Sequence, residues 1–459
     1  MSEHGDGASS DGPIAPLYRR LPRGPHKLAP TEVAHHQRIR MHGAMVEAVA
    51  ANGYERTSVK QVIGLAGVSR RAFYEQFSNK QECFLATFDL IAARGAKHAT
   101  EAFKATDGDL QARLGASYEV LTGGIESNPK GASLAIVEAE RTGTVGLAHL
   151  RRAAAAFEHM LRLTFAAAPE LGPLPVPVAR AIVGGLHEAI AVPLRAGRTK
   201  GISRLSSGML DWTLLFQAAD RRRLPETLTR RMRAVERTAK PVRIEDEPVG
   251  EELRERLLSS VLQLAVMDDY NVLSPPQIAE HAGVAPEAFF DLFENKDQCF
   301  LEAFDEMARD VVRVTANPEL TGGDWPVAVH RAISELMGLL AERPLYAHTI
   351  ARIAPGAGRQ ALERDYQLGR EITALLTDGA PDAPESQLAA TGVSGALWHT
   401  VRCQVISNQV HLLPAFADYL AYVALTPFIG SEHAADAVLE CVQAELGRQR
   451  RRPERSMAR

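Results

Sequence analysis

Apolar residues recur along this chain at the three- and four-residue spacings of helices, and almost no stretch alternates as a strand does. From about Thr31 to Asn52, one face of a predicted helix carries Ile39, Gly43, Val46 and Ala50. Asn52-Gly53 then supplies a left-handed helix end. Helical text rich in Ala and Leu continues over about 95–220, and a second long helical region runs to about Leu446. The pattern predicts an all-α protein.

Between residues 57 and 91 the pattern predicts two short helices followed by a longer one. Each begins after a residue that can cap a helix: Thr57 or Ser58, then Ser69, then Asn79 with Glu82 three residues on. Gly67 ends the first short helix after Ala66, and the second ends near Phe77. Two helices joined by a short turn with glycine form a helix-turn-helix, whose second helix enters the major groove of DNA.

The same segment occurs twice in the chain. Residues 58–89 overlay residues 274–305 without a gap, at a shift of 216 positions. The identical residues are mostly caps, the glycine break and apolar positions, and they include Ser58, Ala66, Gly67, Val68, Ala72, Phe73, Phe77, Asn79, Lys80, Cys83, Phe84, Leu85, Phe88 and Asp89. Because the period is about half the chain, the repeat predicts two complete units and not a solenoid.

In the first copy, the second helix of the motif offers both a buried and an exposed set of residues. The residues that suit a core are Ala72, Phe73 and Phe77. The residues that can point outward are Arg70, Arg71 and Tyr74. Arginine can contact guanine edges and phosphates through two hydrogen bonds, and a tyrosine hydroxyl suits a phosphate oxygen. Lys80 and the free N–H groups of the next helix can hold another phosphate.

The residues around this motif resemble the DNA-binding domain of the TetR/AcrR family of bacterial transcriptional regulators. The matching positions are Gly53, Thr57-Ser58, Ala66-Gly67-Val68-Ser69-Arg70, Phe73-Tyr74, Phe77, Asn79-Lys80 and Phe84. The resemblance covers about 35–95. Residues 95–220 are compatible with the family's ligand-binding and dimerisation domain by helical class and length alone. The preceding LPRGPHKL resembles a basic arm of some members.

The resemblance implies a ligand-responsive transcriptional regulator that releases operator DNA when a small molecule binds, with repression as the expected sign. By matching position, the DNA contacts would be Thr57, Ser58, Lys60, Ser69, Arg70, Arg71, Tyr74 and Lys80. The basic arm would add Arg20, Arg23 and Lys27 in the minor groove or on phosphates. Each residue also has a plainer interpretation, as a helix cap, as solvated surface or as part of a disordered basic tail.

The second copy keeps the apolar residues of the motif and loses its basic ones. Five polar residues of the first copy are replaced in the second: Lys60 by Pro276, Ser69 by Ala285, Arg70 by Pro286, Arg71 by Glu287 and Tyr74 by Phe290. The formal charge of Gly67–Lys80 is +2, from Arg70, Arg71 and Lys80 against Glu75. The formal charge of Gly283–Lys296 is −2, from Lys296 against Glu287, Asp291 and Glu294. This change removes most of the attraction to a phosphate backbone, so the second copy is expected to fold without binding DNA.

The chain is therefore predicted to hold two TetR-like units, each a three-helix helix-turn-helix domain followed by a helical-bundle ligand-binding and dimerisation domain. The predicted segments are a disordered tail and basic arm over 1–34, the first helix-turn-helix domain over 35–95 with its motif at 58–77, a helical effector domain over 96–220, a charged linker over 221–250, a degenerate helix-turn-helix domain over 251–311 with its motif at 274–293, a second helical domain over 312–446 and a basic tail over 447–459.

Composition narrows the function classes. The 459 residues are too many for one ordinary core, and 46% hydrophobic with 24% charged residues is normal for a soluble globular protein. A net charge of −4 requires any DNA binding to come from a local basic patch. Four cysteines without a CxxC pair suit a reducing cytoplasm. No uninterrupted apolar run is long enough to span a bilayer, and the N-terminus is unlike a signal peptide.

No catalytic motif is present, since GxSxG, P-loop, GxGxxG and HExxH patterns are all missing from the sequence. We therefore expect no enzyme activity, no cofactor and no metal. One set in the first helical region could line an effector pocket or bind a metal, although core or surface positions explain it as well: His149, His159, His187, Glu138, Glu140 and Glu188. Trp212, Trp398 and Tyr422 are expected to pack helices.

Two alternatives stay open at the level of sequence. The protein is either a homodimer of chains or a pseudo-dimer of two halves within one chain. Operators of the family are usually palindromic, and a single helix-turn-helix domain makes few DNA contacts. Both points favour the dimer of two chains. The rival function is a helical module that binds a protein or sequesters a ligand without specific DNA binding, as the degenerate copy and the acidic overall charge would allow.

Overall fold

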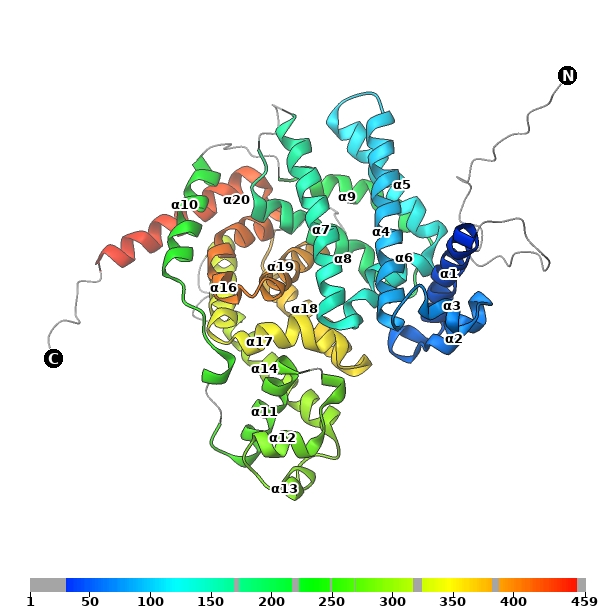
Figure 1. Cartoon of the computed structure of the whole chain (residues 1–459). Coiled ribbons are helices and arrows are strands. Elements are labelled where there is room, and N and C mark those ends of the chain that lie inside the picture. Colours follow the sequence, from blue (N-terminus) through cyan, green and yellow to red (C-terminus); the bar gives the residue numbers. More distant parts are fainter. Residues whose placement is uncertain are drawn as a thin grey trace. The chain divides into compact units, whose positions relative to one another are not determined.

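The computed structural model describes residues 30–168, 173–216, 223–247, 250–268, 270–316, 324–381 and 388–451 (Figure 1). Over these ranges the chain forms helices and no strand, which confirms the predicted all-α class. The chain divides into two compact units. Unit 1 runs to Thr142 and includes Ala191–Ser206, and unit 2 comprises Gly143–Ile190 and the chain from Ser207. The helices predicted to form one effector domain over 96–220 are thus shared between both units.

Unit 1 begins with the predicted helix-turn-helix segment and continues into longer helices. Its elements are α1 (Pro30–Arg56), α2 (Val59–Ala66), α3 (Arg70–Tyr74), α4 (Lys80–Ala105), α5 (Leu110–Ser127), α6 (Pro129–Ile136), η1 (Glu138–Thr142) and η2 (Ile202–Arg204). Gly53 interrupts α1 with a φ of 75°, so the regular helix ends where the Asn52-Gly53 pair predicted.

The core of α1–α4 contains Phe73 and Phe77, as the sequence pattern predicted, together with Phe84. The predicted face of α1 is only partly correct: Val46 is buried, but Ile39 is half-buried and Ala50 is exposed. The fully buried side chains of α1 are instead those of Met41 and Met45. A buried polar contact accompanies them, since His42 Nδ1 lies 2.8 Å from Thr87 Oγ1. Burial, with a smaller contribution from Arg38, lowers the pKa of His42 to about 4, so this histidine is neutral inside the core.

Unit 2 holds the remaining helices. Its elements are α7 (Gly143–Ala166), α8 (Val176–Arg195), α9 (Leu205–Leu214), α10 (Arg223–Thr238), η3 (Ile244–Asp246), α11 (Leu253–Met267), η4 (Tyr270–Val272), α12 (Pro275–His281), α13 (Pro286–Phe290), α14 (Lys296–Thr315), α16 (Trp325–Glu342), α17 (Pro344–His348), η5 (Thr349–Ile353), η6 (Ala354–Gly356), α18 (Arg359–Thr377), α19 (Ala389–Ile406), η7 (Val410–Phe416) and α20 (Ala417–Arg451). The residues of α8 from Ala191 and the first two of α9 belong to unit 1.

Helices α8 and α19 come from opposite halves of the sequence and cross in direct backbone contact. An added Cβ at Gly184 would lie 2.5 Å from the carbonyl oxygen of Gly395, and one at Gly395 would lie 2.3 Å from that of Gly184. Trp212 of α9 fills the space beside this crossing, against Gly185 and Gly392. Its ring is 1% exposed and donates a hydrogen bond to the carbonyl of Ile182. Trp212 therefore packs helices, as expected from the sequence.

The charged segment over 221–250 contains an ordered helix, α10, which packs into unit 2. Leu224 and Leu228 of α10 are buried, and Thr229 lies 2.9 Å from the hydroxyl of Tyr419. Arg231 forms an ion pair of 2.7 Å with Asp418, which also lies 2.9 Å from the buried ring of His330. The basic face of α10 is thus held by acidic groups of α20.

Two helices are long and apolar enough to cross a membrane by length and composition: Val176–Arg195 and Val410–Gly447. Neither is an uninterrupted apolar run, since charged residues such as Arg180 and Asp418 lie within them. In the structure 67% and 78% of their most apolar windows are buried inside the protein. Their apolar residues therefore pack against other helices, as in the core helices of a soluble protein.

Candidate nucleic-acid interface

Helix α2 and the turn after it are fixed by local hydrogen bonds. Ser58 caps α2 by accepting the N–H of Gln61, whose side chain accepts the N–H of Ser58 in return. Gly67 ends α2 in the left-handed conformation with a φ of 62°, and its N–H donates to the carbonyl of Ile63. The turn that orients the next helix is therefore determined by its own residues.

Helix α3 separates a buried face from an exposed one. Ser69 caps it by accepting the N–H of Ala72, and Ala72 and Phe73 are buried in the core. Arg70 and Arg71 are exposed, and the ring of Tyr74 is 46% exposed. The expected division of the helix into core and surface residues is thus present.

The cations on α3 are held only by weak local contacts. The guanidinium of Arg70 lies 5.6 Å from the centre of the Tyr74 ring. Arg71 Nε pairs with Glu75 Oε1 at 2.8 Å, and these side chains are 89% and 57% exposed. Exposed pairs of this kind contribute about 0–1 kcal/mol, so Arg71 can exchange Glu75 for a phosphate at little cost.

Two of the predicted contact residues are engaged within the domain. Thr57 is 3% exposed, and its hydroxyl donates to the carbonyl of Gly53. Lys80 is half-buried, and its Nζ donates to the carbonyls of Tyr54 and Glu55 at 2.9 and 3.2 Å. Lys80 Nζ also lies 4.2 Å from the centre of the Tyr54 ring. The main partners of Lys80 in the structure are thus the last carbonyls of α1.

The remaining predicted positions divide between exposed sites and undescribed ones. Lys60 lies exposed on α2, close in sequence to the cap. Arg20, Arg23 and Lys27 lie outside the described residues. Arg38 was missed by sequence reasoning: this exposed residue of α1 donates to Gln76, just after α3, and stacks 5.0 Å from the Phe77 ring. The sequence feature that could have revealed Arg38 is its position next to Ile39, which places a cation on the polar side of the first helix.

Helices α11–α14 repeat three of these local features: the cap of the first short helix, the left-handed glycine and the lysine contact with two carbonyls. Ser274 and Gln277 form the same reciprocal cap, and Gly283 has a φ of 66°. Lys296 Nζ donates to the carbonyls of Tyr270 and Asn271, 2.8 and 3.1 Å away. It lies 4.7 Å from the centre of the Tyr270 ring. Tyr54 and Tyr270 are also 216 positions apart in the sequence, but they precede the segment in which the repeat was recognised.

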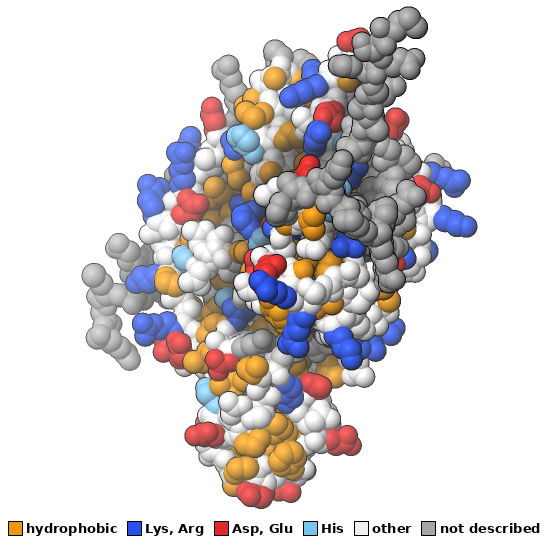
Figure 2. Space-filling view, turned by 45° about the vertical axis from the view of Figure 1, so that its right-hand side comes forward, with side chains coloured by type: hydrophobic (Ala, Val, Ile, Leu, Met, Phe, Trp, Pro, Cys, Tyr) orange, Lys and Arg blue, Asp and Glu red, His pale blue; other side chains and the backbone are white. Residues whose placement is uncertain are grey.

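The outer surface of α13 differs from that of α3. The Ala285 position provides no side-chain cap, and Pro286 occupies the first turn. Phe289 is buried, whereas Phe290 is 55% exposed. Figure 2 shows hydrophobic and acidic side chains gathered on this part of unit 2, at the lower end of the view. The exposed surface here is apolar and acidic where α3 is basic.

The histidines singled out in the first helical region do not form a metal site among the described residues. Their acidic neighbour Glu138 instead pairs with Arg141 at 3.2 Å and accepts the N–H of Tyr54. The group of metal-ligating atoms that the described part of the chain does bring together is Glu158, His399 and Cys403. Sequence reasoning missed it, and the available signal was the four-residue spacing of His399 and Cys403.

An apolar pocket lies in unit 2. Its lining includes Phe165 of α7, Phe216 after α9, and Tyr419 and Tyr422 of α20. Tyr422, expected to pack helices, is 3% exposed and contacts Phe216 ring to ring, with centroids 6.2 Å apart. The lining is largely aromatic and apolar, and the hydroxyl of Tyr419 is hydrogen-bonded to Thr229.

Comparison with known proteins identifies the N-terminal domain. Residues 44–87 match the sequence model of the family described as bacterial regulatory proteins, tetR family. No curated protein sequence matches the chain. The matched residues span the described helix-turn-helix, from the middle of α1 into α4.

Solved structures with partial similarity to this chain include bacterial transcriptional regulators. The fatty acid degradation regulator FadR from Bacillus halodurans has 17% identity, covering 38% of this chain and 96% of that one, with a TM-score of 0.35. FadR from Bacillus subtilis, in complex with stearoyl-CoA, has 17% identity, covering 39% and 98%, with a TM-score of 0.36. A TetR family regulator from Marinobacter aquaeolei VT8 has 19% identity, covering 39% and 96%, with a TM-score of 0.32.

The identification depends on the family match and on the helix-turn-helix geometry at the same residues. Residues 44–87 therefore belong to a helix-turn-helix domain that is similar to those of the tetR family of bacterial regulatory proteins.

Proposed function

We propose that the protein represses transcription by binding operator DNA through α3 and releases it when a small molecule binds in its helical body. The observation that carries the proposal is the exposed set Arg70, Arg71 and Tyr74 on a helix whose other side is fixed in the core by Phe73. Arginines on a helix of this size can reach base edges in the major groove.

The other contacts are assigned by exposure. Ser58, Lys60 and Ser69 surround the turn and are exposed, so they suit phosphate oxygens. Arg38 extends this set on the side of α1. Thr57 and Lys80 have competing partners inside the domain, which supports a role in positioning α2 and α4 more than a direct contact. Arg20, Arg23 and Lys27 are assigned to the minor groove or to phosphates on sequence grounds alone.

The test is DNA binding by the full chain with the region upstream of its own gene. A variant carrying R70A, R71A and Y74A should bind at least about a hundredfold more weakly, since each base or phosphate contact contributes about 1–3 kcal/mol. The matched control changes the corresponding residues of the second copy, P286A, E287A and F290A, and should bind as the wild type does. Equal binding by all three proteins would exclude α3 as the reading helix.

We further propose that residues 251–311 form a degenerate helix-turn-helix, so that the chain is a tandem of two TetR-like units. The matching contacts of Lys80 and Lys296 support a common fold for both copies. The apolar and acidic surface of α13 supports the loss of DNA binding in the second copy. Adding the α3 residues to the second copy, as P286R, E287R and F290Y, should raise non-specific DNA affinity. Unchanged affinity would argue against an equivalent orientation of α13.

We also propose that the two halves pair within one chain. The supporting observation is the crossing of α8 with α19, in which each backbone occupies the space of the other's missing side chains. A surface packed this closely is not available to a second chain. This arrangement gives a pseudo-dimer with one DNA-binding helix-turn-helix. It replaces the dimer of two chains that palindromic operators would favour.

The apolar pocket beside α20 is the proposed effector site, and its aromatic lining suits an apolar small molecule. Filling it by Leu174→Trp should abolish the release of DNA by such a molecule while leaving DNA binding intact. Retained release would place the effector elsewhere.

The rival function, protein binding without specific DNA recognition, has one observation in its favour. Phe290, Val272 and Leu292 are exposed on the second copy, with exposed fractions of 55%, 69% and 38%. DNA binding by the wild type and the two triple variants separates the two functions, because a protein-binding module would show no sequence-specific DNA binding in any of them.

A further inference from the structure

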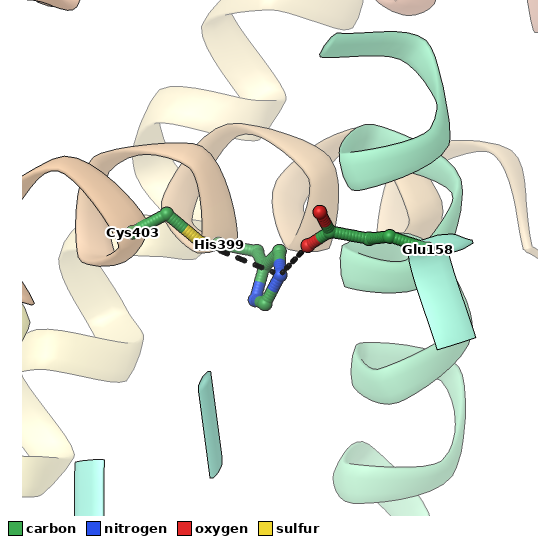
Figure 3. Close-up of side chains that lie close together, drawn as sticks. All are labelled: Glu158, His399 and Cys403. Carbon is green, nitrogen blue, oxygen red and sulfur yellow. Dashed lines mark hydrogen bonds and ion pairs between the residues drawn. The ribbon is translucent and has the colours of Figure 1, made fainter. Parts of the chain in front are cut away.

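A buried cluster of three polar side chains lies in unit 2, whereas the residues proposed to bind DNA belong to unit 1. Helix α7 supplies Glu158, and α19 supplies His399 and Cys403, which are one turn apart. His399 Nε2 lies 3.6 Å from Cys403 Sγ and 3.6 Å from Glu158 Oε1 (Figure 3). The imidazole is thus placed between a thiol and a carboxylate, on helices from different halves of the chain.

Two arginines add positive charge to this cluster. Arg151 Nη1 lies 3.0 Å from Glu158 Oε1, and Arg180 Nε lies 3.9 Å from Glu158 Oε2. Both guanidinium groups lie beside a cluster in which Cys403 is 2% exposed. Glu188 of α8 also approaches α19 here, since an added Cβ at Gly395 would lie 2.6 Å from the Cβ of Glu188. Cations this close to a buried thiol stabilise its thiolate.

The titration behaviour agrees with this arrangement of charges. Burial acts to raise the pKa of the Cys403 thiol, but His399, Arg180 and Arg151 together hold the pKa below its ordinary value. Burial acts to lower the pKa of His399, yet Cys403 and Glu158 raise that pKa to about 9. Burial raises the pKa of Cys83 and of Cys299 to about 12. Those thiols are therefore internal references for an unactivated buried cysteine.

The same three side chains have the ligand types of a metal site, and the separations of 3.6 Å are close to the edges of a tetrahedral zinc site. A divalent ion would, however, place two further positive charges beside Arg151 and Arg180. It would also compete with Arg151 for the same oxygen of Glu158. The charges around the cluster therefore favour an anion at Cys403 over a bound cation.

We propose that Cys403 is a reactive thiolate and a site of reversible oxidation by hydroperoxides. Sγ attacks one peroxide oxygen, so that an S–O bond forms as the O–O bond breaks. Sulfur is oxidised by two electrons, which reduce the leaving oxygen. The imidazolium of His399 gives that oxygen its proton, so water or an alcohol departs and a sulfenic acid remains on Cys403. Glu158 orients the imidazolium and is itself fixed by Arg151.

The position of Cys403 gives the oxidation a structural consequence. An added Cβ at Gly184 would lie 2.5 Å from the Cβ of His399, one turn before Cys403 on α19. The thiol therefore borders the closest contact between α8 and α19. One additional oxygen in such a close-packed region forces side chains or helices to shift, so oxidation should loosen the pairing of the two halves.

The experiment treats the full chain with hydrogen peroxide in the presence of excess dimedone, and follows each cysteine by peptide mass spectrometry. Cys403 should be trapped at least about tenfold faster than Cys441, although Cys441 is the more exposed of the two, at 7% against 2%. Between about pH 6 and pH 8 the wild-type rate should rise less steeply than that of an ordinary thiol, because the neighbouring cations hold the pKa of Cys403 below its ordinary value. In H399Q the rate should rise about tenfold per pH unit, as it does for an ordinary thiol of pKa about 8.5. C441S is the matched control and should leave the rate at Cys403 unchanged.

The wild-type pH profile needs no variant, so the proposal stays testable even if H399Q does not fold. A wild-type rate at Cys403 that rises about tenfold per pH unit would overturn it, as would trapping of Cys441 before Cys403. A stoichiometric Co²⁺ complex with a sulfur-to-cobalt charge-transfer band, protecting Cys403 from dimedone, would assign the cluster to a metal instead.

Discussion

Lys80 and Lys296 show that residues kept in both copies serve the fold. Each extends its amine to two backbone carbonyls at the end of the preceding helical segment and lies over a tyrosine ring. Arg70 and Arg71 make no comparable contact with the core, and the second copy has replaced them. Contacts inside the domain thus separate the residues required for folding from those available to DNA.

The first prediction concerns this lysine pair. Lys80→Met and Lys296→Met should each lower the free energy of unfolding of their domain by about 1–3 kcal/mol, because a charged donor is removed from two helix-end carbonyls. Denaturant unfolding of both variants measures the change. A loss of stability confined to Lys296→Met, with Lys80→Met losing only DNA affinity, would contradict the structural role of Lys80.

The second prediction concerns His42, whose pKa of about 4 lies below the unfolded value of about 6.5. Between these values the unfolded chain binds more protons than the folded one, so stability is present above pH 6.5 and is lost as the pH falls toward 4. The loss attributable to His42 should be about 3 kcal/mol. Unfolding measured at several pH values should therefore be less pH-dependent in His42→Gln than in the wild type, and parallel curves would contradict the assignment.

At the scale of elements, the two turns are the parts that sequence predicted best. Ser58, Gly67 and Ser69 act on neighbours within a few residues, so their roles could be derived from spacing alone. The crossing of α8 with α19 could not, because Gly184 and Gly395 meet across half of the chain. The cluster of Glu158 with His399 was missed for the same reason: no local pattern joins residues on such distant helices.

The third prediction compares the two turn glycines. Gly67→Ala and Gly283→Ala should each destabilise their domain by about 1 kcal/mol, since both glycines have positive φ. At Gly283 the new Cβ would lie 2.9 Å from the guanidinium of Arg256, whose flexible side chain can move aside. Thermal or denaturant unfolding measures both changes, and a neutral effect at both positions would contradict the left-handed turns.

At the scale of the whole molecule, a chain with a net charge of −4 presents a basic α3 on one of two similar domains. This asymmetry could be predicted from the sequence, since it follows from substitutions at aligned positions. The packing of α10 against α20 could not, because the charges of residues 221–250 suggested a linker. The charges of a segment indicate that it prefers water, but they do not reveal an oppositely charged helix, such as α20, that packs against it.

The fourth prediction concerns the assembly state. If the halves pair within the chain through α8 and α19, light scattering should give a mass near the 49.9 kDa of one chain. The same species should bind DNA with sequence preference. A mass of twice that value at all protein concentrations would contradict the single-head pseudo-dimer and restore the chain dimer.

The central claim is that the N-terminal domain alone reads DNA sequence through the exposed residues of α3. Selection of bound DNA from a random pool by the full chain tests it most directly. The account predicts enrichment of one short sequence by the wild type and by the P286A, E287A and F290A variant, and none by the R70A, R71A and Y74A variant. Enrichment of the same sequence by the latter, or no enrichment by the wild type, would contradict it.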